Sequence, residues 1–116
     1  MEHVEEDILG KFDQILFEFH DLILSDSKRK RAQITDALER LNRTHQLVHL
    51  HGNNTGGVLY LGEACFPDVL EATYVNRAVY SIREDAQPEL PISCDAPNNP
   101  HNEEICLGRW NEMKIP

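Results

Sequence analysis

The sequence predicts an α/β fold, with a small mixed sheet of three to four strands and two main helices. The first observation is that two apolar segments, residues 14–20 and 46–51, have the length and composition of buried strands. The second is that apolar residues between these two segments recur at helical spacing. A strand, a helix and a strand of these lengths are typical of a βαβ unit with parallel strands. The third is residues 69–75, a strand that follows too closely for a helical crossover and is therefore expected to be antiparallel.

The N-terminal part is expected to contain a short helix and the first strand. Residues 2–9 have an amphipathic pattern, and Gly10 is well placed to stop that helix. In the strand at residues 14–20, Glu18 and His20 share one face by the period of two, and three apolar side chains share the other. Both faces are largely apolar, which favours a strand that is covered on both sides.

Helix-capping residues and turn-forming residues predict where the long helix and the later segments begin and end. We expect this helix to begin at one of the N-capping residues 25–27 and to end near Asn42. Its buried stripe consists of apolar residues at helical spacing, Ile34, Ala37, Leu38 and Leu41. Glycine and asparagine then predict a loop, a short strand and a turn, at residues 52–57, 58–61 and 62–67.

The chain is long enough for one domain with its own core. We divide it into an α/β domain at residues 1–82 and an irregular tail at residues 83–116, where four prolines forbid long regular elements. Ile105 and Trp110 indicate that this tail packs on the domain.

Charge and cysteine count restrict the partners. The formal net charge of −9 argues against nucleic acid and anionic membranes, because phosphate groups need clustered cations. No apolar run approaches the length of a membrane span, so we expect no membrane contact and a cytoplasmic location. The three cysteines form no CxxC pair, which argues against a disulfide framework and a thiolate zinc site.

Four segments together resemble the C-terminal half of FkbM-type methyltransferases, which depend on S-adenosylmethionine. They are residues 12–20 (FDQILFEFH), 41–54 (LNRTHQLVHLHGNN), 67–75 (PDVLEATYV) and 94–100 (CDAPNNP). The resemblance implies a Rossmann-like sheet in which the strand at residues 69–75 lies between the other two. It also implies O-methylation of a sugar or another small-molecule acceptor.

The cofactor-binding half of such an enzyme has no counterpart in this sequence. No GxGxxG loop occurs, so no cofactor-binding residue is carried over. S-adenosylmethionine belongs to the full-length family by resemblance, and we expect this chain alone neither to bind it nor to be active. The chain is then a fragment or a natural remnant of a methyltransferase. The alternative is a non-catalytic binding or self-association module.

The candidate catalytic residues are Glu18, His20 and His51. Parallel strands end at one rim, where open α/β sheets bind ligands, and this would bring His20 and His51 together. An imidazole with a pKa near neutrality could take the proton of an acceptor hydroxyl. A second reading is a structural network, in which a buried Glu18 is hydrogen-bonded to a histidine. A third is a divalent metal, with His20, His49 and His51 as candidate ligands.

Further candidates lie beside this rim. Asn53, Asn54 and Asp68 are predicted to bind the substrate, although Asp68 could instead be a turn residue after Pro67. By the period of two, Leu47 shares a face with His49 and His51. We therefore expect His49 to be buried and structural, and His51 to meet the substrate.

A last prediction concerns assembly. The strand at residues 14–20 is expected to have an open apolar edge, and such an edge invites pairing with another chain. The sequence therefore predicts a homodimer or other self-association through that edge.

Overall fold

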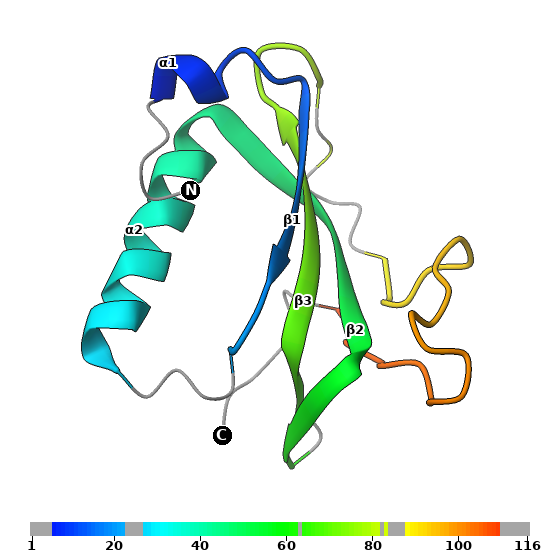
Figure 1. Cartoon of the computed structure of the whole chain (residues 1–116). Coiled ribbons are helices and arrows are strands. Elements are labelled where there is room, and N and C mark those ends of the chain that lie inside the picture. The colour runs from blue at the N-terminus through cyan, green and yellow to red at the C-terminus, as the bar shows by residue number, and fades with distance from the viewer. Residues whose placement is uncertain (1–5, 23–26, 63, 82, 84–87, 110–116) are drawn as a thin grey trace.

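The computed structural model describes residues 6–22, 27–62, 64–81, 83 and 88–109. Its elements, in chain order, are α1 (Glu6–Leu9), β1 (Gln14–Phe19), α2 (Lys28–Thr44), β2 (His45–Leu61) and β3 (Ala64–Asn76). Figure 1 shows the long helix α2 on one side of the sheet, and the segment of residues 88–109 beside β2 on the other side. The predicted α/β class, with three strands and two helices, is confirmed.

The sheet has the strand order β1-β3-β2, and both neighbouring pairs are antiparallel. β1 and β2 therefore run in the same direction, as expected for a βαβ unit, but β3 lies between them. The prediction of a mixed sheet was wrong for the described strands, because the tight β2–β3 hairpin returns the chain antiparallel to both neighbours. The order is the one that the resemblance implied, but a strand order alone assigns no activity.

β2 is much longer than predicted. Residues 52–57, expected as a loop, lie inside the strand, and their register with β3 shifts between Asn53 and Val58. Asparagine and glycine here mark a bulge, which lets the ladder continue on both sides, and not the end of a strand. The turn is correspondingly shorter than the predicted 62–67: Gly62 has a φ of 62°, and β3 begins at Ala64.

A second bulge changes which side chains share a face of β2. Leu47 is paired with Tyr74, and the next pair is His49 with Thr73, so Val48 is the extra residue. Leu47 consequently packs in the cluster that contains Tyr74, on the face opposite to His49. The prediction that Leu47 shares a face with His49 was wrong, because one extra residue breaks the period of two.

The helix α2 begins as predicted and ends slightly later. Ser27 is its N-cap and accepts a hydrogen bond from the backbone N–H of Lys30. The helix continues past Asn42 to Thr44, and His45 is both its C-cap and the first residue of β2. Of the helix predicted at residues 2–9, residues 2–5 lie outside the described part, and α1 occupies Glu6–Leu9.

Two apolar clusters hold the layers together. One lies between α2 and the sheet and is formed around Leu41, Ala72 and Tyr74. The other joins the segment of residues 88–109 to the β2–β3 hairpin, and its buried members are Cys65, Leu90, Ile105 and Leu107. Trp110, predicted to anchor the tail, lies outside the described residues. In the described part of the chain, no helix is both long and apolar enough for a membrane span.

Candidate functional site

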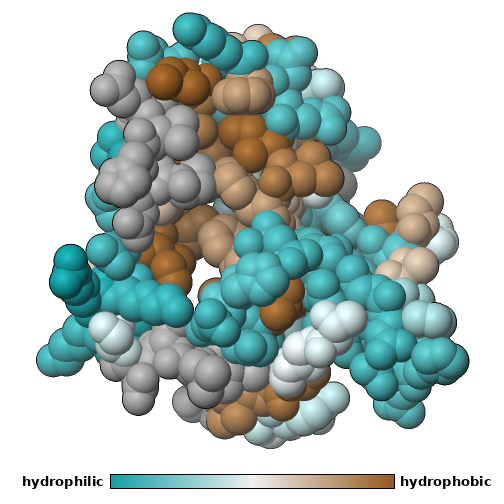
Figure 2. Space-filling view, in the orientation of Figure 1, coloured by the Kyte–Doolittle hydropathy of each residue, from teal (hydrophilic) through white to brown (hydrophobic). Residues whose placement is uncertain are grey.

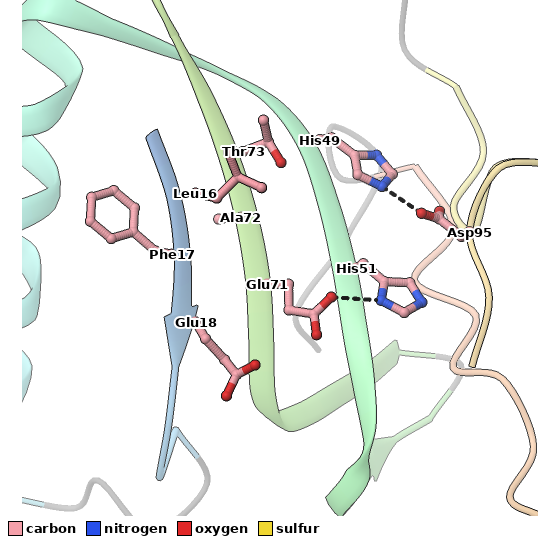
Figure 3. A pocket seen from close by; sticks show the side chains of 9 residues that line it. All are labelled: Leu16, Phe17, Glu18, His49, His51, Glu71, Ala72, Thr73 and Asp95. Carbon is pink, nitrogen blue, oxygen red and sulfur yellow. Dashed lines mark hydrogen bonds and ion pairs between the residues drawn. The ribbon is translucent and has the colours of Figure 1, made fainter. Parts of the chain in front are cut away.

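The polar face of the sheet carries a row of ionisable side chains. Glu71 on the central strand is paired with Glu18 on β1 and with His51 on β2. Partners directly opposite each other in antiparallel strands point to the same face, so these three groups lie side by side. A cavity of about 400 Å³ opens over them (Figure 3), lined by Leu16, Phe17, Glu18, His49, His51, Glu71, Ala72, Thr73 and Asp95.

His51 lies at the junction of two strands and the tail. Its Nδ1 is 3.0 Å from Oε2 of Glu71, and its Nε2 is 3.1 Å from Oε1 of Glu104. Burial by itself would lower the pKa of His51. The hydrogen bonds to Glu71 and Glu104, together with the negative charges of Glu104 and Asp95, outweigh it, so this pKa is raised above 6.5. Both ring nitrogens are engaged by carboxylates, which favours the structural reading of this residue over a general base.

His49 makes a separate pair with the tail. Its Nε2 is 2.8 Å from Oδ1 of Asp95, and Oδ2 of Asp95 accepts the backbone N–H of Ile92. The His49 side chain is 24% exposed, whereas that of His51 is 7% exposed. The expectation that His49 is the buried member of the two was wrong, because Glu104 of the tail closes over His51.

Glu18 and His20 form a pair at the edge of the sheet. Oε1 of Glu18 is 2.6 Å from Nε2 of His20, and the two side chains are 43% and 60% exposed. Glu18 lines the cavity but is not the buried carboxylate of the structural reading. His20 does not line the cavity. Phe19, the last residue of β1, and Gly52 are both paired with Leu70, so His20 lies further along the sheet than His51.

The three histidines considered as metal ligands each have a different carboxylate partner. His20 is paired with Glu18, His49 with Asp95, and His51 with Glu71 and Glu104. Among the described residues, no group of three or more His, Cys, Asp or Glu side chains is arranged to hold a metal ion.

Asn53 and Asn54 are buried, and neither lines the cavity. Oδ1 of Asn53 accepts hydrogen bonds from the backbone N–H and the hydroxyl of Thr55, which stabilises the bulge. Nδ2 of Asn54 donates to three backbone carbonyls of the tail, and its Oδ1 accepts the N–H of Asn99. Nδ2 of Asn53 also lies 3.5 Å from Oε1 of Glu71. These amides therefore hold the tail and the strand, and they are not part of the cavity lining.

Asp68 lies inside β3, together with Pro67, so the alternative of a turn residue was wrong. Its backbone carbonyl accepts the N–H of Leu22. It does not line the cavity.

Glu104 was missed as a functional residue, because its role depends on the path by which the tail returns to β2. Glu71 carried a signal: it is a carboxylate in the middle of an otherwise apolar strand, where burial requires a partner. Oε1 of Glu71 also accepts a hydrogen bond of 2.7 Å from Nδ2 of Asn98.

Comparison with known proteins gives no further identification of this site. No family model, no curated protein and no solved structure matches the chain.

Proposed function

We propose that this chain is the acceptor-side half of an O-methyltransferase related to the FkbM type, which holds a small hydroxylated molecule in the cavity over Glu18, Glu71 and His51. The observation that carries the proposal is the cavity itself. Its volume of about 400 Å³ lies within the range of roughly 300–1,000 Å³ that is typical of small-molecule sites.

The lining suits a sugar or a similar acceptor. Glu18, Glu71 and Asp95 present carboxylate oxygens, which accept hydrogen bonds from hydroxyl groups. Thr73 adds a hydroxyl, and Leu16 adds an apolar side chain against which the C–H face of a sugar ring can pack.

Within this proposal, Glu18 is the general base. It is the most exposed of the three lining carboxylates, at 43% against 33% for Glu71 and 12% for Asp95. It accepts a hydrogen bond from the acceptor hydroxyl and takes its proton, while His20 orients the carboxylate from outside the cavity. His51 fixes Glu71 and does not itself exchange protons with the acceptor.

S-adenosylmethionine does not suit the lining of this cavity. The lining contains no glycine-rich turn at a helix N-terminus that would approach its adenosine or its carboxylate. The proposal therefore assigns the cofactor to a separate half, and no step of the chemistry above passes through it. A cytoplasmic location is part of the same proposal, supported by Cys65, Cys94 and Cys106 being free thiols.

Titration calorimetry tests the proposal. A panel of monosaccharides and other small polyols should include a compound that binds the wild-type chain, and S-adenosylmethionine added alone should give no heat. Glu18→Gln should weaken binding of that compound about tenfold, because one charge-assisted hydrogen bond is lost. Glu39→Gln removes an exposed carboxylate of α2 and should leave binding unchanged. Absence of binding across the panel, or binding of S-adenosylmethionine to this chain alone, would contradict the proposal.

The second candidate is a non-catalytic module that assembles through its sheet. It is favoured by the edge of β1, which has no strand beside it among the described residues. This candidate predicts self-association without any small-molecule binding, so the same titrations distinguish it from the first.

A further inference from the structure

The outer edge of β1 presents unpaired backbone groups. Asn76 donates its N–H to the carbonyl of Asp13, which fixes the hydrogen-bonding phase of the β1–β3 ladder. By the alternation of antiparallel pairs, the odd-numbered residues of β1 bond to β3, and the N–H and C=O groups of Gln14, Leu16 and Glu18 point outward. Among the described strands, only β3 pairs with β1. An edge of this kind is a template for another strand.

Exposed apolar side chains lie on β1 and on the segment that precedes it. Leu16 is 72% exposed, and Ile8 and Phe12, which precede it on α1 and the following turn, are exposed as well. Figure 2 shows hydrophobic side chains gathered over the upper part of β1, next to α1. Exposed apolar surface that is continuous with an open strand edge marks an interaction surface.

We propose that the occupant of this edge is a second copy of the chain, whose β1 pairs antiparallel with β1 about a two-fold axis at Leu16. The result is a continuous six-stranded sheet in which both polar faces lie on the same side. A two-fold axis between antiparallel strands must be perpendicular to the sheet, so each residue faces a partner from the same face of β1. The residue at the axis therefore faces its own copy. The two residues nearest the middle of β1 are Leu16 and Phe17, and each defines one possible register.

Side-chain complementarity selects the register about Leu16. In it, Gln14 faces Glu18 of the partner subunit, and Leu16 faces its own copy. Nε2 of Gln14 donates one N–H to the Tyr80 hydroxyl of its own subunit, and its second N–H is the donor for the carboxylate opposite. The outward backbone groups of Gln14, Leu16 and Glu18 all become paired. In the register about Phe17, Leu16 would instead face a carboxylate.

The dimer also completes the cavity. Leu16 and Glu18 line it from β1, the outer strand of the sheet, so its wall on that side is open to the edge. In the proposed register, Gln14 of the partner subunit lies beside Glu18 and adds an amide to the same polar face. Each subunit thus supplies one side chain to the site of the other.

Sedimentation equilibrium tests the dimer without reference to any ligand. The wild-type chain should associate to a dimer, and Leu16→Lys should be monomeric, since it places two ammonium groups opposite each other at the axis. Leu59→Lys introduces the same charge at an exposed apolar position of β2 and should keep the wild-type dimer. Circular dichroism of both variants reports whether they fold. A wild-type monomer at the highest soluble concentration, or a folded Leu16→Lys variant that is still dimeric, overturns the proposal.

Substitutions at Gln14 test the register. Gln14→Lys forms two ion pairs per dimer with Glu18 and should tighten the dissociation constant roughly fivefold, whereas Gln14→Glu should weaken it by a similar factor. Unchanged dissociation constants for both variants would exclude the register about Leu16. Because the measurement is made on the unliganded chain, failure of the dimer and failure of acceptor binding are separate outcomes.

Discussion

At the scale of single residues, His51 is the group on which most of the polar face depends. Its imidazole ring bridges Glu71 on β3 and Glu104 on the tail, and Glu71 in turn accepts a hydrogen bond from Asn98. When protonated, a ring buried to this degree is stabilising only while both of its carboxylate partners stay in place.

His51→Gln should lower the free energy of unfolding by about 2 kcal/mol at mildly acidic pH, because hydrogen bonds to charged partners are lost. The pKa of His51 is raised in the folded state, so this contribution is fully present below the unfolded pKa of about 6.5. It disappears as the pH rises through the folded pKa. Urea unfolding of both proteins across this pH range measures the difference, with the exposed His101→Gln as the control. A difference that is constant with pH would argue against the imidazolium.

Gly52 tests the close packing of the tail on β2. A Cβ at this position would lie 2.9 Å from Cγ2 and 3.0 Å from Cβ of Ile105. Gly52→Ala should therefore cost about 1–3 kcal/mol of stability, as overpacking does in other cores. Gly57→Ala meets no atom within 4 Å and should be neutral or slightly stabilising in the same thermal unfolding experiment. Equal stability of the two variants would show that the tail can move away from Gly52.

Part of the candidate site could be predicted from the sequence. Glu18, His49 and His51 were recognised from alternating patterns, and all three line one cavity. The partners of His51 could not be found in this way, because Glu71 and Glu104 lie 20 and 53 residues away in the sequence. Such pairings depend on strand register and on the return path of the tail, which local patterns do not contain.

At the scale of elements, the two bulges of β2 decide what faces the cavity. The apolar parts of α2, β1 and β3 were predicted because their periods of 3.6 and 2 are regular. β2 was predicted as two separate strands, residues 46–51 and 58–61, because a bulge leaves no signal in the hydrophobic pattern and the Asn-Gly residues between them resemble a loop. One extra residue, Val48, is sufficient to put Leu47 and His49 on opposite faces.

One buried amide, that of Asn54, makes several of the hydrogen bonds that hold the tail to β2. Asn54→Asp replaces the donor Nδ2 by an oxygen that faces the carbonyls of Asn99, Asn102 and Glu103. We expect a loss of about 3 kcal/mol or more, because one oxygen of the buried carboxylate keeps the N–H of Asn99 but the other faces three carbonyls and has no donor. Limited proteolysis should cleave residues 88–109 faster in this variant. Asn42→Asp, at an exposed position near the end of α2, should cost less than about 1 kcal/mol and leave proteolysis unchanged.

At the scale of the whole molecule, the two faces of a three-stranded sheet have different coverings. The helix α2 packs on the apolar face, and the segment of residues 88–109 reaches the polar face through Asp95 and Glu104. Neither covers the outer edge of β1 within the described part of the chain. Within the described residues, the sheet is therefore covered by α2 on one face, covered only in part by the tail on the other, and open at the edge of β1.

The proposed dimer makes stability depend on concentration. A dimer that dissociates on unfolding has a melting temperature that rises with protein concentration. Wild-type chain should show this rise in scanning calorimetry, and Leu16→Lys should melt at one temperature throughout the dilution series. A wild-type melting temperature that does not change with dilution would indicate that folding and association are independent.

The junction of α2 with β2 has a mechanical consequence. His45 caps the helix and begins the strand, it is fully buried, and its ring bonds to the Thr44 hydroxyl and to the carbonyl of Phe12. No residue separates the two elements, so we expect a tilt of the helix to be transmitted to the start of the strand. A contact that displaces α2 is therefore expected to shift His49 and His51, because both lie on the strand that begins at His45.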